Sequence, residues 1–224
     1  MIKNIPKHIA IIPDGNRRWA RKNNLPTFEG HRKGFDAIIG IARKSREMGI
    51  KILTVWAFST ENWNRSKSEI KYLMELYQIM IDKHLKEALK NKIRIVHLGR
   101  KDRLSPTLMN KIINAENKTK DFSDYYMCIA LDYGGRDEIL RAAKKGNIID
   151  TNNMDSKLDT SVIPYKDPDL VIRTGGEKRL SGFMLWQIAY SELMFVDKLL
   201  PDFSPDDFEE CIKKYSQRNR RFGR

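Results

Sequence analysis

Three segments of the sequence combine acidic, basic and glycine residues at spacings that suit the binding of phosphate groups. The first follows the apolar run 8–12 and reads Asp14-Gly15-Asn16-Arg17-Arg18-Trp19. Arginine side chains and the N–H groups at a helix start bind phosphate oxygens, whereas a carboxylate among them suits a hard cation such as Mg²⁺. This segment therefore predicts a phosphate site with Mg²⁺ at Asp14. A plain Asp-Gly turn capped by Asn16 is the structural alternative.

The second segment follows the apolar run 52–58 and reads Ser59-Thr60-Glu61-Asn62-Trp63-Asn64-Arg65. Ligands of open parallel sheets bind beyond the carboxyl ends of the strands, so this segment is expected at the same edge as Asp14. Helix capping by its Ser, Thr, Asn and Glu side chains explains the composition equally well. Both interpretations stay open at the level of the sequence.

The third segment follows the apolar run 170–173 and reads Arg173-Thr174-Gly175-Gly176-Glu177-Lys178-Arg179-Leu180-Ser181. Its arginines can form paired hydrogen bonds with phosphate oxygens, and its glycines allow close approach of the backbone. A solvated basic loop is the alternative. Further on, Glu192 is flanked by apolar residues, where an unpaired carboxylate is costly, so we expect Mg²⁺ or an arginine as its partner. The arginine-rich end 218–224 is typical of a disordered tail.

The elements that must position these segments alternate between strands and helices. Apolar runs with little polar alternation predict strands covered on both faces at 8–12, 52–58, 93–98, 125–131 and 170–173. Helical periodicity predicts helices at 33–48, 68–89, 106–118 and 137–145, whereas the polar composition of 146–167 predicts a solvated loop. This alternation indicates an α/β fold with a mostly parallel sheet surrounded by helices. A length of 224 residues fits a single domain, 1–224.

Composition narrows the class of ligand without choosing one. The formal net charge of +13 favours phosphates, nucleic acid or anionic lipid as partners. The basic residues gather at strand ends beside acids instead of alternating with aromatic residues, so no nucleic-acid partner is expected. The absence of a signal-like start or a long apolar run predicts a cytoplasmic protein without a membrane span. Cys128 and Cys211 are expected to be packing residues.

Together these residues resemble the cis-prenyltransferase family, the enzymes similar to undecaprenyl diphosphate synthase. The resemblance extends from about Pro6 to Gly223 and rests on several motifs in a family-like order. The motifs are His8 to Trp19, Gly30-His31, Trp56 to Arg65, Tyr133-Gly134-Gly135-Arg136, Asp167 to Leu193 and the arginine-rich end. Their combination is far more specific than any one of them.

The resemblance implies a fold and an activity. The fold is a central, mostly parallel six-stranded sheet surrounded by helices, with an apolar tunnel and usually in a homodimer. The apolar stripe of 68–89, which periodicity assigns to the core, resembles the helix that lines this tunnel. The activity is the Mg²⁺-dependent condensation of an allylic isoprenoid diphosphate with isopentenyl diphosphate. Its product, a cis-polyprenyl diphosphate, is a precursor of glycosyl-carrier lipids and associates with membranes, which suggests a location at their periphery.

The resemblance also implies roles for individual residues. Asp14 and Asn62 match catalytic residues, and Asp14 and Glu192 match Mg²⁺ ligands, Glu192 near the dimer interface. Asn16, Arg18 and His31 match residues that hold the allylic diphosphate, whereas Arg173, Arg179 and Ser181 match the isopentenyl diphosphate site. Segment 59–65 matches a mobile loop over the substrates. The full set of implied substrate-binding residues is Gly15, Asn16, Arg17, Arg18, Trp19, His31, Ser59, Thr60, Glu61, Trp63, Arg65, Arg173, Arg179, Ser181, Arg221 and Gly223.

Some positions depart from the family pattern. Thr27 stands where an arginine commonly binds the allylic diphosphate, and Asp132 stands where Asn is frequent before the Tyr-Gly-Gly-Arg run. Pro13 and Gly182 also replace usual residues, a Met or Leu and an Asn respectively. Thr27 leaves irregular coupling open, in which a dimethylallyl unit is the nucleophile and a branched product forms. A third reading is a subunit that activates a related catalytic partner in a heteromer, although Asp14 is present. Product length and primer do not follow from the sequence.

Overall fold

The computed structural model describes residues 4–146 and 148–218. In this part of the chain, six strands form one parallel sheet in the order β3-β4-β2-β1-β5-β6. The strands are β1 (His8–Ile12), β2 (Ile52–Ser59), β3 (Ile93–Leu98), β4 (Tyr125–Tyr133), β5 (Leu170–Arg173) and β6 (Glu192–Phe195). The α/β architecture with a central parallel sheet is therefore confirmed.

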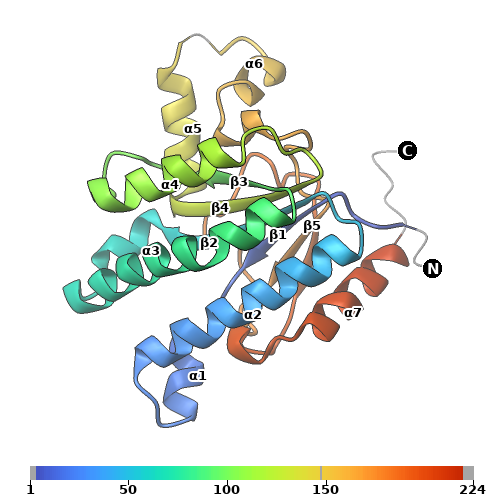
Figure 1. Ribbon diagram of the computed structural model, residues 1–224. Helices are drawn as coiled ribbons and strands as arrows, with labels where there is room; N and C mark the ends of the chain where they lie inside the picture. The colour runs from blue at the N-terminus through green and yellow to red at the C-terminus, as the bar shows by residue number, and fades with distance from the viewer. Residues whose placement is uncertain (1–3, 147, 219–224) are drawn as a thin grey trace. The chain divides into compact units, whose positions relative to one another are not determined.

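Helices lie between most consecutive strands, and two more follow the last strand (Figure 1). The α-helices are α1 (Asn16–Lys22), α2 (Thr27–Glu47), α3 (Lys67–Lys90), α4 (Pro106–Lys118), α5 (Gly135–Lys144), α6 (Thr151–Asp155) and α7 (Pro205–Ser216). The 3₁₀ helices are η1 (Thr60–Asn64), η2 (Asp159–Val162) and η3 (Leu200–Asp202). Serine residues cap the N-termini of several helices. The side chains of Ser66, Ser105 and Ser204 each accept a hydrogen bond from a backbone N–H of the first turn.

Several predicted elements differ from the structure by one or two residues at an end, and two differ by more. Helix α2 begins at Thr27, six residues before the predicted start at 33, because Pro26 supplies the extended residue before a helix instead of a polar cap. Segment 146–167 is not a plain solvated loop, since it contains α6 and η2. Met154 and Leu158 are buried there against Ala142, so a few apolar residues among many polar ones determine its structure. Strand β6 was not among the predicted strands, although it has four residues, as β5 does.

The chain forms two compact units, and the first comprises 4–53, 167–180 and 187–218. Its core is β1, all of whose residues are buried, as expected of a strand covered on both faces. Strand β1 pairs with β5, and β5 pairs with β6. Helix α2 packs against α1, η3 and α7, and it runs beside α7 in Figure 1. Lys44 Nζ of α2 lies 2.8 Å from Glu209 Oε2 of α7.

The second unit comprises 54–166 and 181–186. Strand β3 pairs with β4 along its whole length, and α4 packs against both β3 and α3. The predicted apolar stripe of α3 is buried at Leu73 and Tyr77 and half-buried at most of its other positions. This stripe therefore belongs partly to the core, and the apolar tunnel of the family stays a prediction.

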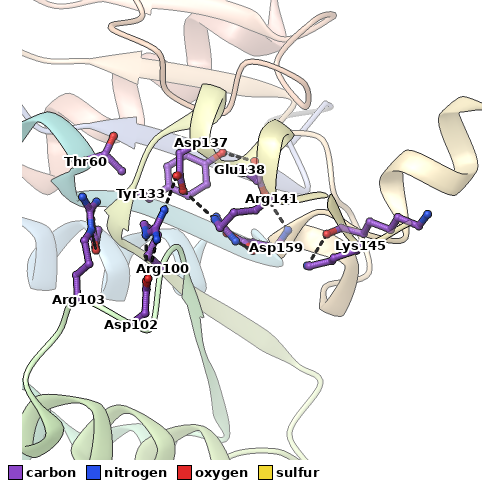
Figure 2. Close-up of polar contacts among 12 residues, drawn as sticks. Thr60, Arg100, Asp102, Arg103, Tyr133, Asp137, Glu138, Arg141, Lys145 and Asp159 are labelled. Atoms are coloured by element: carbon purple, nitrogen blue, oxygen red, sulfur yellow. Dashed lines mark hydrogen bonds and ion pairs between the residues drawn. The ribbon is translucent and has the colours of Figure 1, made fainter. Parts of the chain in front are cut away.

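A polar network connects α5 to its surroundings in the second unit (Figure 2). Asp137 accepts hydrogen bonds from Arg100 and from Arg141, each at 2.8 Å. The buried Glu138 accepts a hydrogen bond from the Tyr133 hydroxyl at 2.5 Å, and burial with the Glu138 charge raises the pKa of Tyr133. These bonds fix the start of α5 directly after β4.

Among the described residues, no helix is both long enough and apolar enough to span a membrane. Both cysteines are buried and free of disulfides, which agrees with their expected role in packing. Burial raises the pKa of the Cys128 thiol to about 12 and that of Cys211 to about 11.

We predict that neither cysteine of the folded protein reacts rapidly with iodoacetamide at pH 8, because burial and a raised pKa keep each thiol protonated. In urea both should react, since an unfolded cysteine has a pKa of about 8.5. Each raised pKa contributes stability that is fully present below the pKa of the unfolded cysteine. This stability is lost as the pH rises from there towards the pKa of the folded state. Mass spectrometry of alkylated peptides measures both rates, and rapid labelling of native Cys128 would contradict the expectation.

Candidate functional site

The first unit places Asp14 directly after β1, where it is bonded to the end of β5. The Asp14 N–H donates to Thr174 Oγ1 at 2.9 Å, and the Thr174 hydroxyl donates to the Asp14 carbonyl at 2.9 Å. The same carbonyl accepts a hydrogen bond from the Leu200 N–H at 2.9 Å. The backbone of Asp14 is thus fixed by three bonds, and its carboxylate has a defined position at the carboxyl end of the sheet.

The Asp14 carboxylate lies between two arginines. Its Oδ2 accepts a hydrogen bond from the buried Arg173 at 2.9 Å, and its Oδ1 accepts one from Arg18 at 3.1 Å. Glu177 forms ion pairs with both Arg18 and Arg179. Arg173 also donates to the backbone carbonyl of Arg179. Three arginines and two carboxylates therefore form one continuous charged cluster with a net positive charge, which suits an anionic ligand.

Backbone glycines allow this close packing. Gly175 has a φ of +86°, and a Cβ there would lie 2.6 Å from an Arg18 guanidinium nitrogen. The N–H of Gly175 donates to the Lys198 carbonyl at 2.7 Å, and that of Gly176 donates to the Val196 carbonyl at 2.9 Å. The Gly-Gly pair therefore lets the strand end turn while Arg18 lies against it.

Asn16 and His31 lie together beside this cluster. Asn16 Nδ2 lies 3.4 Å from His31 Nδ1, on the buried face of α2. Asn16 Oδ1 is buried and has no hydrogen-bond partner among the described residues. Gly34 keeps the space for it, since a Cβ at Gly34 would lie 2.4 Å from this oxygen. A buried polar atom without a partner is costly, so Asn16 is the predicted site residue whose geometry most favours contact with a polar ligand. Its side chain does not cap α1, so the capping alternative for Asn16 is wrong.

Other predicted residues have different surroundings. Arg17 is exposed on α1, and Gly15 adopts a φ of +107° before it. The Trp19 indole N–H donates to Asp202 Oδ1 at 2.7 Å, which ties α1 to η3. Trp19 thus has a structural partner in addition to its predicted substrate role.

Glu192 lies at the opposite end of the strands from Asp14. It begins β6 and aligns through Leu170 with Ile9, near the start of β1. Asp14 comes five positions after Ile9 and two after the end of β1, which is roughly 16 Å of extended chain. Its carboxylate forms an ion pair with Arg218, so an arginine is the partner that the structure provides. Asp14 and Glu192 of one chain therefore do not share one ion.

The predicted loop residues 59–65 and Ser181 belong to the second unit. The side chains and backbone N–H groups of Ser59 and Asn62 form reciprocal capping bonds, so the capping interpretation of this segment is confirmed for both residues. Thr60 Oγ1 donates to Glu61 Oε1 at 2.9 Å, and Arg65 donates to Glu69 Oε1 at 2.9 Å. Ser181 has a φ of +52° and is exposed. Arg221 and Gly223 lie outside the described residues.

Comparison with known proteins identifies the family. The family model described as "Putative undecaprenyl diphosphate synthase" matches residues 12–223. An isoprenyl transferase of Aquifex aeolicus is 46% identical over 98% of this chain and 96% of its own. An isoprenyl transferase of Thermotoga maritima is 45% identical over 98% of this chain and 97% of its own. The chain belongs to the undecaprenyl diphosphate synthase family. The class of its activity is therefore prenyl transfer.

Solved structures of the undecaprenyl diphosphate synthase fold agree with this assignment. Lavandulyl diphosphate synthase from Lavandula x intermedia, in complex with dimethylallyl diphosphate, superposes with a TM-score of 0.95 at 36% identity and covers 98% of this chain and 99% of its own. A probable undecaprenyl diphosphate synthase from Campylobacter jejuni superposes with a TM-score of 0.83 at 36% identity. It covers 99% of this chain and 100% of its own.

Several residues that position the side chains around Asp14 were not predicted from the sequence. Thr174 and Glu177 stand inside a segment that was singled out for its arginines and glycines, yet no role was assigned to either. A hydroxyl directly after a strand that carries an arginine could have indicated the bond to Asp14. No sequence signal could have indicated Gly34, because its importance depends on the position of Asn16 in space.

We predict that Gly34→Ala weakens the binding of magnesium diphosphate, because the new methyl group displaces the Asn16 amide. The loss should be about tenfold, equivalent to one hydrogen bond to a charged group. The midpoint temperature of thermal unfolding should stay the same or rise, since alanine forms helices better than glycine does. Isothermal titration with inorganic diphosphate measures the affinity.

Gly40→Ala is the matched control on the same helix, since its methyl group would meet only the Pro205 ring, at 3.2 Å. Equal affinities of the two variants for diphosphate would show that Asn16 is not displaced or does not bind the ligand.

Proposed function

We propose that this protein condenses an allylic isoprenoid diphosphate with isopentenyl diphosphate, head to tail, to give a cis-polyprenyl diphosphate. The observation that carries this proposal is the position of Asp14 between Arg173 and Arg18 at the carboxyl end of β1. The family assignment supplies the reaction class, and the charged cluster supplies groups suited to two diphosphates. The polyprenyl product would serve as a precursor of a carrier lipid for glycosyl groups.

The charge distribution of the cluster suits the departure of diphosphate. When the allylic carbon–oxygen bond breaks, negative charge develops on the diphosphate and positive charge on the delocalised carbon. Arg18, Arg173 and Arg179 are positioned to stabilise the first, since each can donate several N–H groups to phosphate oxygens. Arg173 is held in advance by its buried contacts, so little reorganisation is needed when the charge appears. The alkene of the second substrate then attacks the carbon, and loss of a proton leaves a new double bond.

The donor set around Asp14 fits a magnesium ion that is bound jointly with substrate. Among residues 4–146 and 148–218, no group of three or more His, Cys, Asp or Glu side chains could form a metal site made of protein alone. Magnesium often binds through one or two carboxylates plus substrate phosphates, which matches a single carboxylate in an arginine-rich cluster. Asp14 would hold the ion against the diphosphate, and the ion would supply further neutralisation of the leaving group.

Glu192 is proposed to act in a homodimer. Because it lies far from Asp14 along the strands of its own chain, a role in magnesium binding requires the site of a partner subunit. Its ion pair with Arg218 would then have to open or be shared.

The decisive experiment incubates the purified protein with Mg²⁺, labelled isopentenyl diphosphate and allylic primers of several lengths. We expect products that differ by one five-carbon unit, with cis double bonds, as measured by mass spectrometry and NMR. Asp14→Ala should lower kcat/KM by about 100-fold or more, because the carboxylate that orients the ion and Arg173 is gone. Chelation with EDTA should abolish turnover, and added Mg²⁺ should restore it.

Asp36→Ala is the matched control, since it removes an exposed carboxylate whose ion-pair partner among the described residues is Arg32, on the surface. It should retain wild-type activity. Turnover by Asp14→Ala at the rate of Asp36→Ala would contradict the proposal.

Irregular coupling is the second candidate, because the structure of a lavandulyl diphosphate synthase superposes closely on this chain. Thr27 also supports it, since the family commonly has an arginine there for the allylic diphosphate. Thr27 is exposed at the first position of α2. A branched ten-carbon diphosphate formed from dimethylallyl diphosphate alone would favour this candidate over elongation.

We predict that Thr27→Arg lowers the KM for the allylic primer by about tenfold, as expected of one added charge-assisted hydrogen bond. The neutral Thr27→Gln variant controls for side-chain length and should leave this KM unchanged. Steady-state kinetics at saturating isopentenyl diphosphate measure both values. An unchanged KM in Thr27→Arg would mean that this position does not face the allylic diphosphate.

A further inference from the structure

Asp132 is a buried carboxylate in the second unit that the proposed reaction does not use. It lies near the end of β4, its side chain is fully buried, and its φ is +53°. This left-handed conformation is unfavourable for most residues and is adopted most readily by Gly, Asn and Asp. The backbone around it is also fixed, since the Asp132 carbonyl accepts a hydrogen bond from the Arg100 N–H at 3.0 Å.

The Asp132 carboxylate joins two side chains from other parts of the unit. Its Oδ1 accepts a hydrogen bond from the Trp63 indole N–H at 2.8 Å. Arg103 donates to Oδ2 through Nε at 2.9 Å and also donates to Oδ1. This bidentate geometry is the strongest arrangement of an arginine with a carboxylate. The buried charge of Asp132 is therefore neutralised by one cation, Arg103.

Arg103 also contacts the ring of Trp63. The guanidinium carbon of Arg103 lies 5.7 Å from the centroid of the indole, within the range of a cation–π interaction. On another side, the ring of Phe58 meets the indole edge-to-face, with centroids 5.3 Å apart. The indole is thus held by a hydrogen bond at its nitrogen, a cation near its ring and an aromatic neighbour.

The end of β4 touches η1 at a second point. A Cβ at Gly134 would lie 2.4 Å from Thr60 Oγ1, so the backbone of Gly134 packs directly against the first residue of η1. Figure 2 shows Thr60 and Arg103 near the end of the strand that carries Tyr133. The two contacts hold η1 at its beginning, through Thr60, and near its end, through Trp63.

We propose that Asp132 and Arg103 are positioning residues: by holding Trp63, they keep the η1 turn in its reactive conformation. This inference rests on the proposed function and on the catalytic role that the family resemblance implies for Asn62 of η1. Neither Asp132 nor Arg103 contacts a reacting atom in this scheme. Both act through the indole of Trp63, whose position sets that of Asn62 one residue earlier.

The negative charge at Asp132 gives this arrangement a specific dependence on Arg103. An asparagine at this position would accept the same hydrogen bond from Trp63, would tolerate the same φ, and would need no cation. Removal of Arg103 from the present chain leaves a buried carboxylate without a counter-ion, which is far more costly than removal of the whole pair. The carboxylate would then draw in water or move, and the indole would lose its fixed partner.

Four variants test this dependence. Arg103→Met should lower kcat/KM by about 10- to 100-fold, mainly through kcat, since misplacement of a positioned group affects the reacting geometry more than binding. Asp132→Asn should stay within about threefold of wild type, because the acceptor for Trp63 remains. The double variant Arg103→Met with Asp132→Asn should recover most of the activity lost in Arg103→Met. Lys101→Met is the control, since it removes the same charge two positions before Arg103. The Lys101 side chain is exposed, and its nearest described carboxylate is Glu116, at 3.8 Å.

A spectroscopic readout separates positioning from general loss of structure and from failure of the proposed function. The chain contains four tryptophans, so 5-fluorotryptophan labelling gives four ¹⁹F resonances, and Trp63→Phe assigns one of them. That resonance should broaden or split in Arg103→Met, return to a single sharp line in the double variant, and stay unchanged in Lys101→Met. These spectra need no substrate and no turnover.

The outcomes are distinct. If the wild type transfers no prenyl group from any donor while the Trp63 resonance responds as expected, the proposed function fails and the positioning of η1 stands. If the double variant is no more active than Arg103→Met, or if Arg103→Met matches Lys101→Met, the inference is overturned. If Arg103→Met does not fold, the activity and the Trp63 resonance are compared in Arg103→Lys and the double variant instead. Arg103→Lys keeps the charge and should retain activity and a single Trp63 resonance.

Discussion

The constraint on which the first unit depends is the neutralisation of Asp14 at the end of a strand buried on both faces. The guanidinium of Arg173, the last residue of β5, is buried and would be costly if it were unpaired, and the half-buried Asp14 carboxylate at the end of the neighbouring strand removes that cost. The pairing is possible only because β1 and β5 run in parallel register and end together, with Ile12 opposite Arg173. Thr174 and the glycines that follow it then fix the backbone on either side, so the sheet determines the geometry of the charged cluster.

The same register explains why charged residues at the two ends of the strands have separate roles. The carboxyl end of β1 and β5 carries Asp14 and Arg173, whereas the amino end of β6 carries Glu192 with Arg218 as its partner. Strand length therefore separates two acids that the sequence motifs place in one metal-binding set. Both acids could serve one site in the proposed homodimer, and this links the catalytic proposal to the oligomeric state.

Much of the fold was predictable from the sequence because β1, β5 and the long helices have strong local patterns. The apolar run 8–12 and the helix 106–118 were predicted with the bounds that the structure shows. The predictions failed where tertiary contacts decide the structure, as in 146–167, whose few apolar residues pack on α5. Among site residues, Asp14, Arg18 and Arg173 were predictable as charges beside strand ends. Their mutual contacts, and the roles of Gly34 and Arg103, depend on distances in space that no local pattern contains.

Each unit contains a carboxylate near the carboxyl end of a strand that pairs with arginine, namely Asp14 and Asp132, and the two differ in exposure. The Asp14 side chain is 28% exposed and its partner Arg18 is 42% exposed, so water and ions can reach the pair. In the proposed reaction, Asp14 would exchange the guanidinium of Arg18 for a metal ion at little cost, since the carboxylate is never left unsolvated. The Asp132 side chain is fully buried, so its pair with Arg103 cannot exchange partners without exposing a charge to an apolar interior. An exchangeable carboxylate suits a site that must bind and release ligands in every turnover, whereas a permanent one suits a support that must hold its geometry throughout.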